Sequence, residues 1–403
     1  MRSDVLPLRS IVESGLCIGC GLCVPIGGPE NVQMRLTSSG VERPAERTPV
    51  SGDALRLINQ VCPGLHVQQR VDVEPAPHPL WGPVRRIATG HATDPEVRFL
   101  AATGGVLTAL GQFLLTSGRV DRILHVGASS DPVRHEAKIS TTPQQVLERS
   151  GSVYGPAAPL VRLYEALEEP GQVAVIAKPC DIAAVRSVLR SDPTLEASVA
   201  CLLTISCGGA SKLTKTWGLL DDFGVAYDDV AELSYRGSGN PGPTRVRTRS
   251  GEVHETTYQQ LWENEGTWDL QWRCKVCADG VGETADLVSL DCWPGGGPTG
   301  EDAGFNGIIA RTEVGAELLS AAVEAGAVTI TEDELDIEVL ELWQPHQSRR
   351  KLATPGRLAA MADAGLPTVD FVGFGLEALP GEVDEGTAVR IAERRHADDQ
   401  PAW

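Results

Sequence analysis

The sequence predicts an α/β fold with a mixed, largely parallel β-sheet at its core. From about residue 84 onward, short apolar runs of β-type residues alternate with segments whose apolar residues have helical spacing. This alternation is typical of strand–helix–strand units, whose strands pair in parallel. Two later stretches, 232–258 and 285–293, are more strand-like, and we therefore expect a mixed sheet rather than a purely parallel one.

The individual elements follow from local patterns. Residues 32–43 contain two short β-type runs around Ser38-Ser39-Gly40, which predicts a small hairpin. Further strands are expected at 84–89, 122–126, 173–177 and 198–205, and helices at 105–115, 182–189 and 212–220. Since the last residues of the chain have no strong periodicity, we expect a helical or loosely packed tail there.

Four regions are expected along the 403 residues, of which 42% are apolar, enough to bury a large core. Residues 1–70 are cysteine-rich with little helical pattern and form a small module. Residues 71–83 are rich in proline and form a linker. Residues 84–345 form the α/β region, and residues 346–403 form the tail.

Charge and composition exclude several classes of function. Lys and Arg total 35 against 54 Asp and Glu, and this net charge of −19 argues against binding to nucleic acid or an anionic membrane surface. No apolar run approaches the roughly 20 residues that span a bilayer, and the first residues lack the apolar core of a signal peptide. We therefore expect a cytoplasmic protein, in which thiols stay reduced. Its ten cysteines then need an explanation other than disulfides.

The N-terminal cysteines have the spacing of an iron–sulfur site. Cys17, Cys20 and Cys23 form C-x2-C-x2-C, and Cys62 is followed at once by Pro63. Such a run with a remote Cys-Pro is typical of ferredoxin-type loops that hold a [4Fe–4S] cluster. The alternative is a structural zinc site, although zinc sites more often combine two separate C-x2-C pairs. The spacing predicts a ferredoxin-like iron–sulfur module.

A second group of cysteines is ambiguous by spacing. Cys274 and Cys277 form a lone C-x2-C, which can be a redox dithiol, half a zinc site or half a cluster site. Cys180 and Cys207 each follow a predicted strand, where α/β folds place their sites. Single cysteines there are also often buried as small apolar residues, so spacing alone leaves a second cluster open.

Two cysteines remain. Cys201 lies in the apolar run VACLLTI and is assigned to the core, and Cys292 is assigned no role.

Two glycine-rich segments are candidates for cofactor loops. Residues 237–242 match G-x-G-x-x-G, but a proline lies inside the motif and a strand pattern follows it, so a dinucleotide-binding fold is rejected there. Thr103-Gly104-Gly105 precedes a predicted helix, where free amide groups could hold a phosphate. An ordinary capped helix explains this segment equally well. No G-x-S-x-G or P-loop motif supports a triad hydrolase or a P-loop NTPase.

The order of the motifs resembles that of one known family. Besides the N-terminal cysteines, the matching segments are 102–110 (ATGGVLTAL), 151–154 (GSVY), 177–183 (AKPCDIA), 235–242 (YRGSGNPG), 274–291 with its C-x2-C, and 311–315 (RTEVG). Together they resemble the beta-subunit family of coenzyme F420-reducing hydrogenase and dehydrogenase, which is related to hydroxymethyl-chlorophyll a reductase and to the ferredoxin-dependent divinyl reductase. The resemblance extends from residue 17 to about residue 325.

The resemblance implies FAD and a second cluster, hence two [4Fe–4S] clusters in all. Carried over to this sequence, the ligands of the second cluster are Cys180, Cys207, Cys274 and Cys277. The implied FAD-binding residues are Thr103, Gly104, Gly105, Val106, Thr108, Gly151, Ser152, Tyr154, Arg236 and Gly237. The candidate catalytic residues are Lys178, Asp181, Asp291 and Tyr154. Lys178 and Asp181 replace the family's Thr and Gln, so F420 is not taken over as the substrate.

The first expectation for function is an iron–sulfur flavoprotein oxidoreductase. It would pass electrons from a one-electron donor such as ferredoxin through both clusters to FAD and on to an unsaturated small-molecule substrate. The alternative is an electron-transfer subunit that exchanges electrons between reduced coenzyme F420 and a larger redox complex. A zinc-containing α/β binding protein without redox function is the third hypothesis. A homo-oligomeric state is left open.

Overall fold

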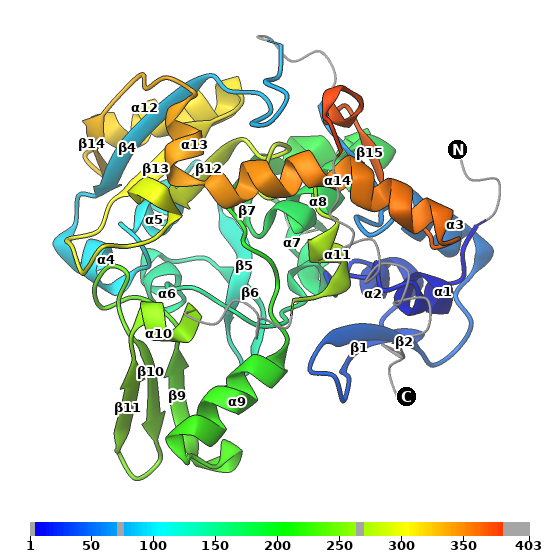
Figure 1. The fold of residues 1–403 in the computed structure, drawn as a ribbon, viewed down its shortest axis with the longest axis horizontal. Helices are drawn as coiled ribbons and strands as arrows, with labels where there is room; N and C mark the ends of the chain where they lie inside the picture. The colour runs from blue at the N-terminus through cyan, green and yellow to red at the C-terminus, as the bar shows by residue number, and fades with distance from the viewer. Residues whose placement is uncertain (1–4, 71–75, 169, 263–269, 382–403) are drawn as a thin grey trace.

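The computed structural model describes residues 5–70, 76–168, 170–262 and 270–381. A central β-sheet lies between two helical layers, and a cysteine-rich N-terminal part packs beside it (Figure 1). No helix in these ranges is long and apolar enough to cross a membrane.

The central sheet has eight strands in the order β14-β4-β13-β12-β8-β7-β5-β6. Their bounds are β4 Arg86–Ala92, β5 Arg122–Ala128, β6 His135–Ser140, β7 Val173–Ile176, β8 Val199–Ile205, β12 Leu287–Asp291, β13 Asn306–Ala310 and β14 Val328–Glu332. Strands β12, β8, β7 and β5 pair in parallel, and the remaining pairings are antiparallel. Strand β4 runs in the same direction as β12, because both are antiparallel to β13. The predicted mixed, largely parallel α/β sheet is confirmed.

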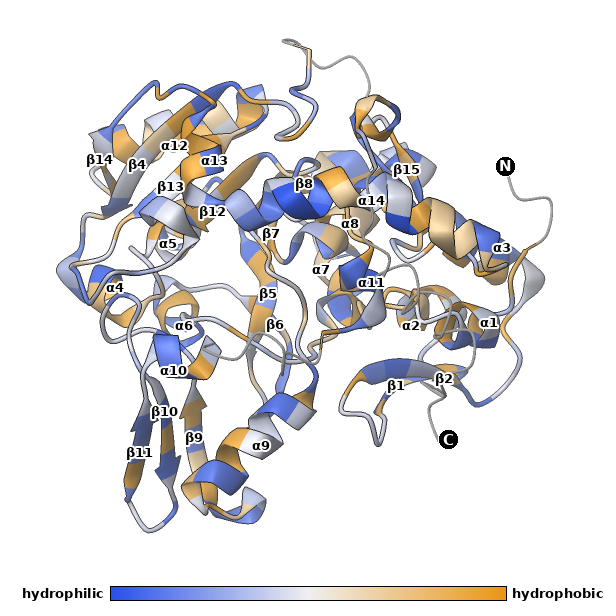
Figure 2. Ribbon diagram, in the orientation of Figure 1, coloured by the Kyte–Doolittle hydropathy of each residue, from blue (hydrophilic) through white to orange (hydrophobic). Residues whose placement is uncertain are grey.

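Alternation along the strands divides the core between the two faces of the sheet. Leu202 and Val288 pack with helix α8 (Pro179–Ser191) on one face. Their neighbours Leu203 and Leu287 pack on the other face, with helices α5 (Val106–Thr116) and α12 (Glu313–Glu324). Both faces are covered, so the central strands are mostly apolar (Figure 2). The other helices are α1 Leu8–Glu13, α2 Cys23–Gly27, α3 Gly52–Val61, α4 Pro95–Leu100, α6 Pro143–Glu148, α7 Leu163–Glu168, α9 Leu213–Phe223, α10 Tyr258–Trp262 and α11 Trp272–Lys275.

The smaller sheets agree with the sequence in part. The predicted hairpin is formed by β1 (Val32–Leu36) and β2 (Glu42–Glu46). The strand-like stretch 232–258 does not enter the central sheet, contrary to the expectation from sequence. It forms a separate antiparallel sheet of β9 Val230–Ser234, β10 Thr244–Thr248 and β11 Val253–Thr256. This sheet has its own apolar core with α9, through Leu220 and Val246, so its strands need not join the main one.

The described part of the C-terminal region is mainly helical, which is one of the two alternatives expected from sequence, and it packs against the rest of the chain. Helices α13 (Val339–Trp343) and α14 (Pro345–Asp363) follow the main sheet, and β15 (Asp370–Val372) pairs in parallel with β3 (His66–Gln68). The chain therefore returns to its N-terminal part. Within the expected linker, residues 71–75 lie outside the described residues, as does 382–403 of the tail, and the domain boundaries stay a prediction.

Candidate functional site

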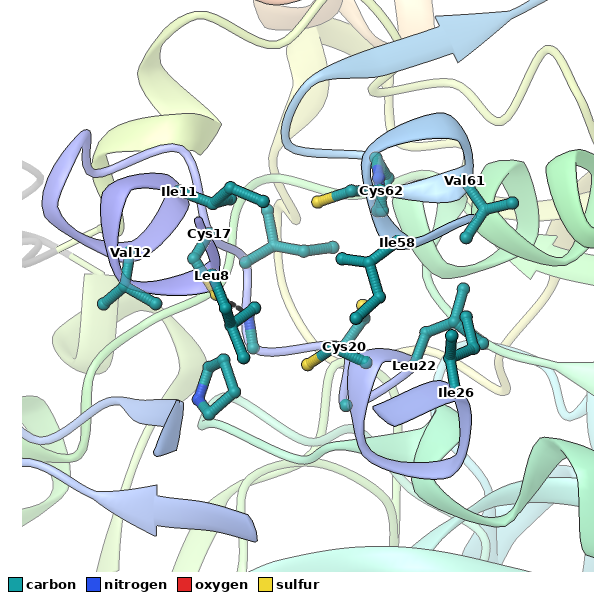
Figure 3. Close-up of a pocket in the computed structure, with 16 residues that line it drawn as sticks. Leu8, Ile11, Val12, Cys17, Cys20, Leu22, Ile26, Ile58, Val61 and Cys62 are labelled. Carbon is teal, nitrogen blue, oxygen red and sulfur yellow. Dashed lines mark hydrogen bonds between the residues drawn. The ribbon is translucent and has the colours of Figure 1, made fainter. Parts of the chain in front are cut away.

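The four N-terminal cysteines predicted to bind iron line one pocket. Cys17 and Cys20 lie on the loop between α1 and α2, Cys23 begins α2, and Cys62 directly follows α3. Apolar side chains of these three helices and of the loop form the walls, among them Leu8, Ile11, Leu22, Ile26, Ile58 and Val61 (Figure 3). The fold thus joins the local C-x2-C-x2-C run to the remote Cys-Pro.

Glycine is required in the loop between these thiols. Gly19 and Gly21 both have positive φ, +69° and +83°, which disfavours any residue with a Cβ. A Cβ on Gly21 would lie 2.4 Å from Cγ1 of Val161, and one on Gly19 would lie 2.6 Å from the carbonyl oxygen of Glu42. The Gly19 N–H donates to Cys17 Sγ at 3.4 Å, a contact of the kind that stabilises a cluster ligand.

Burial disfavours the thiolate form of three of these cysteines unless a positive charge lies nearby. It raises the pKa of Cys20 and Cys23, and it raises the pKa of Cys62 to about 12. The Arg273 guanidinium opposes the shift of the Cys62 pKa and donates to the Pro63 carbonyl at 3.0 Å. Iron would supply the missing charge, since only the thiolate ligates metal. The donor set and the dry pocket fit an iron–sulfur cluster.

The structure also brings together the four cysteines of the second predicted group. Burial raises the pKa of Cys180, Cys207 and Cys274. The charges of Cys207 and Cys274 raise the pKa of Cys180 further, and those of Cys274 and Cys277 raise the pKa of Cys207 further. Cys180 lies in the first turn of α8, Cys207 follows β8, and Cys274 lies in α11. The Ala210 N–H donates to Cys274 Sγ at 3.3 Å. This set of thiols also suits a cluster.

Two of the candidate catalytic residues lie at these thiols and pair with each other. Lys178 Nζ is 2.5 Å from Asp181 Oδ2, and the Asp181 side chain is fully buried. Burial lowers the Lys178 pKa, but the charges of Asp181, Cys180 and Cys20 outweigh it and raise the pKa. Since Lys178 interacts with Cys180 of one group and with Cys20 of the other, the first turn of α8 lies near both groups.

The other two candidate catalytic residues, Tyr154 and Asp291, meet at Arg236. The Arg236 guanidinium donates to both carboxylate oxygens of Asp291 at 3.0 Å, and its charge influences the pKa of Tyr154, which burial raises. It also lies over the rings of Tyr258 and Trp293, at 5.0 and 5.2 Å from their centroids. The two rings were missed from sequence, because nothing in the spacing connects them with Arg236. We call these five residues the Arg236 cluster.

The expected flavin residues divide between contact with this cluster and packing. Thr103 Oγ1 donates to Asp291 Oδ1 at 2.7 Å. The Val106 N–H, however, donates to Asn306 Oδ1 at 3.2 Å, and a Cβ on Gly104 would lie 2.7 Å from Cα of Phe305. The close packing of Gly104 against Phe305 and the hydrogen bond from the Val106 N–H to Asn306 thus explain the start of α5, and no bound ligand is needed to explain it.

The remaining expected flavin residues occupy nearby positions. A Cβ on Gly151 would lie 3.3 Å from the carbonyl oxygen of Arg236, Ser152 interacts with Tyr154, and a Cβ on Gly237 would lie 2.3 Å from the carbonyl oxygen of Leu100. Gly105 directly precedes α5 and has a positive φ of +75°. Thr108 lies in the first turn of α5 and is half-buried. Flavin contact by these residues stays a prediction.

The described side chains do not form a binding site for a single metal ion. In the described ranges, no set of three or more His, Cys, Asp or Glu side chains is placed as the ligands of one ion would be.

Two family models match the chain, and both describe the beta subunit of coenzyme F420 hydrogenase/dehydrogenase. The model of its N-terminal part matches residues 87–165, and the model of its C-terminal part matches residues 171–335. The matched residues include the Arg236 cluster and all four cysteines of the second group, but not the N-terminal group or α14.

Individual relatives agree with these matches. The coenzyme F420 hydrogenase subunit beta of Methanococcus voltae is 24% identical, over 71% of this chain and 98% of the relative. The F420-dependent formate dehydrogenase 1 subunit beta of Methanococcus maripaludis is 23% identical, over 59% of each chain. A chain in the F420-reducing [NiFe] hydrogenase complex from Methanosarcina barkeri has the same fold, with a TM-score of 0.58, 21% identity, and coverage of 73% of this chain and 98% of that one.

Proposed function

Because the chain belongs to the coenzyme F420 hydrogenase/dehydrogenase beta-subunit family, we propose that it is an electron-transfer subunit that exchanges electrons between coenzyme F420 and a larger redox complex. The main support is that eight cysteines gather in two groups, each of which has a member near the first turn of α8. The relatives support the subunit over a stand-alone reductase, since they are named as beta subunits of hydrogenases and formate dehydrogenases.

Each cysteine group is proposed to hold a [4Fe–4S] cluster, with Cys17, Cys20, Cys23 and Cys62 as one ligand set and Cys180, Cys207, Cys274 and Cys277 as the other. Such clusters supply one-electron chemistry when bound. The protein contributes apolar walls that exclude water from the first group. It also contributes the Lys178 cation, which offsets thiolate charge near both groups.

FAD is proposed for the Arg236 cluster. The support is chemical: aromatic rings of Tyr154, Tyr258 and Trp293 surround a fixed guanidinium, and such rings can stack on a flat cofactor. Asp291 holds Arg236 in place, and Thr103 in turn donates to Asp291. A flavin would suit an exchange with F420, because it can take up a hydride and release single electrons.

In a second candidate function, the chain delivers electrons directly to a reductase. The coenzyme F420-dependent sulfite reductase of Methanocaldococcus jannaschii is 22% identical over 81% of this chain, which matches 49% of that protein. A sequence similar to this chain therefore makes up about half of a longer protein that is named as a reductase. Ferredoxin as donor and an unsaturated small-molecule substrate stay predictions of the sequence.

The test uses the full chain, purified without oxygen and saturated with FAD. Oxidation of reduced F420 is followed by its absorbance, with a viologen dye as one-electron acceptor. We expect electron exchange in the wild type and loss of exchange in Cys274→Ala. The control is Cys201→Ala, which changes a cysteine of the hydrophobic core and should keep the exchange. An iron-loaded, flavin-loaded wild type that exchanges electrons with ferredoxin but not with F420 would refute the proposal in favour of the first expectation.

A further inference from the structure

Helix α14 packs its polar side chains against both loops that contain cysteines of the second group. Arg350 donates to the carbonyl oxygens of Cys207 at 2.8 Å and Gly208 at 3.0 Å. Thr354 donates to the carbonyl oxygen of Cys277 at 3.4 Å. One further turn along, Arg357 donates to that of Lys275 at 2.7 Å. One face of the helix thus binds the loop after β8 and the loop around α11.

The fit between α14 and these loops is tight. A Cβ on Gly280 would lie 1.6 Å from Nη2 of Arg350, so a side chain at this position would displace the guanidinium. Gly280 is in turn fixed to the second group, because its carbonyl oxygen accepts from the Cys207 N–H at 2.7 Å. Lys351 anchors the helix through Glu283 at 2.5 Å, with both side chains buried. Such a buried pair holds the helix in one position.

The same segment connects the second group with the Arg236 cluster. Gln344, directly before α14, donates to the carbonyl oxygen of Asp291 at 2.6 Å and accepts from Ser206 Oγ at 2.9 Å. Gln347 donates to Ser206 Oγ and to the Cys207 carbonyl oxygen, both at 3.1 Å. Continuous hydrogen bonds therefore join Asp291 to Cys207.

We propose that α14 is a structural part of the second cysteine site and that Arg350 is its main positioning residue, which fixes the Cys207 loop and raises the reduction potential of the cluster held there. This inference rests on the proposed function. A fixed positive charge stabilises the reduced cluster, which is the more negative state, and the potential rises. The segment lies beyond residue 335, where the family match ends.

The test is a redox titration of the iron–sulfur signals in the full chain, followed by electron paramagnetic resonance. The signal of the second group is the one that Cys274→Ala abolishes. We expect Arg350→Gln to lower the midpoint potential of that signal. Arg350→Lys keeps the charge and should remain closer to the wild type. The matched control is Arg349→Gln, which removes the same charge from the exposed neighbouring position and should leave the potential nearly unchanged.

The outcomes separate this inference from the proposed function. If Cys274→Ala loses no signal, the second cluster and the function proposed from it are refuted. If Cys274→Ala loses the signal but Arg350→Gln has the same iron content and the same potential as Arg349→Gln, only the role of Arg350 is refuted. Loss of iron from Arg350→Gln, with iron retained in Arg349→Gln and in Arg350→Lys, would support the positioning role.

Discussion

At the scale of single residues, both candidate sites depend on the shape of one side chain or on its absence. In the N-terminal group, Gly21 has a backbone conformation that favours glycine and lies against Val161. In the Arg236 cluster, a planar guanidinium satisfies both oxygens of Asp291 while it faces two rings. Neither role can be filled by a residue of similar polarity alone, because both depend on shape. Substitutions at these positions therefore test the two sites independently.

Gly21→Ala should empty the N-terminal group. Its Cβ would lie 2.4 Å from Val161 Cγ1, so the loop that holds Cys20 must move, and iron bound there should be lost. Gly118→Ala is the matched control, because Gly118 also has positive φ, +67°, with no atom within 4 Å of its Cβ position. The control should lose roughly 1–2 kcal/mol in urea unfolding and no iron. Equal iron content in the two variants would contradict the role of Gly21.

Arg236→Lys should release FAD and leave iron in place. A lysine cannot donate to both oxygens of Asp291 in one plane or stack its charge over two rings in the same way. We expect at least a several-fold loss of bound flavin and a smaller loss of stability than the roughly 3 kcal/mol for removing one partner of a buried pair, since lysine keeps the charge. Bound flavin is measured by its absorbance after denaturation. Arg245→Gln, which breaks an exposed pair with Glu255, should change neither, and unchanged flavin in Arg236→Lys would argue against this site.

At the scale of elements, parallel strands place the second cysteine group. Strands β7 and β8 pair in parallel and end side by side. Cys180 follows the first of them in the opening turn of α8, and Cys207 follows the second. The general rule that sites form at the carboxyl ends of such strands predicted this neighbourhood. The rule could not predict that α11 and α14 complete it, because both come from distant sequence.

The buried histidine of β5 should make folding stability depend on pH. His125 Nε2 lies 2.7 Å from Ser140 Oγ of β6, and burial, together with the Arg149 charge, lowers the pKa of His125 to about 4. The unfolded state then binds more protons than the folded state between pH 6.5 and 4, so stability falls on acidification through this range. The wild type should lose about 2 kcal/mol more than His125→Gln between pH 7 and pH 5. Urea unfolding at both pH values measures this difference, and equal losses would contradict it.

Helix α14 shows why part of the site escaped sequence reasoning. Its buried residues include Gln347, Ser348, Lys351 and Thr354, which are polar and leave no apolar stripe for a periodicity search. Their partners are backbone carbonyls and Glu283, and these contacts depend on the tertiary fold alone. By contrast, α5 and α8 have apolar faces that pack on the sheet, and both were predicted close to their observed bounds.

At the scale of the whole molecule, the last described elements of the chain pack against its N-terminal cysteine-rich part. Helix α14 extends from the central sheet toward the N-terminal part, where β15 pairs with β3 (Figure 1). Gln69 donates to Glu283 at 2.9 Å, and Glu283 pairs with Lys351, so three distant segments share one buried polar contact. The N-terminal cysteine group could be proposed from the sequence because three of its members lie within seven residues of one another. The second group could not be derived from spacing, because its cysteines come from three separate segments.

The measurement that tests the central claim most directly is the iron content of cysteine variants purified without oxygen. We expect about eight irons per wild-type chain, for two [4Fe–4S] clusters, and about half of that in Cys20→Ala and in Cys274→Ala. Cys201→Ala and Cys292→Ala, which change buried thiols outside both groups, should keep the full content. A wild type that binds zinc without iron or sulfide, or variants in which Cys20→Ala and Cys274→Ala retain all iron, would contradict the two-cluster arrangement.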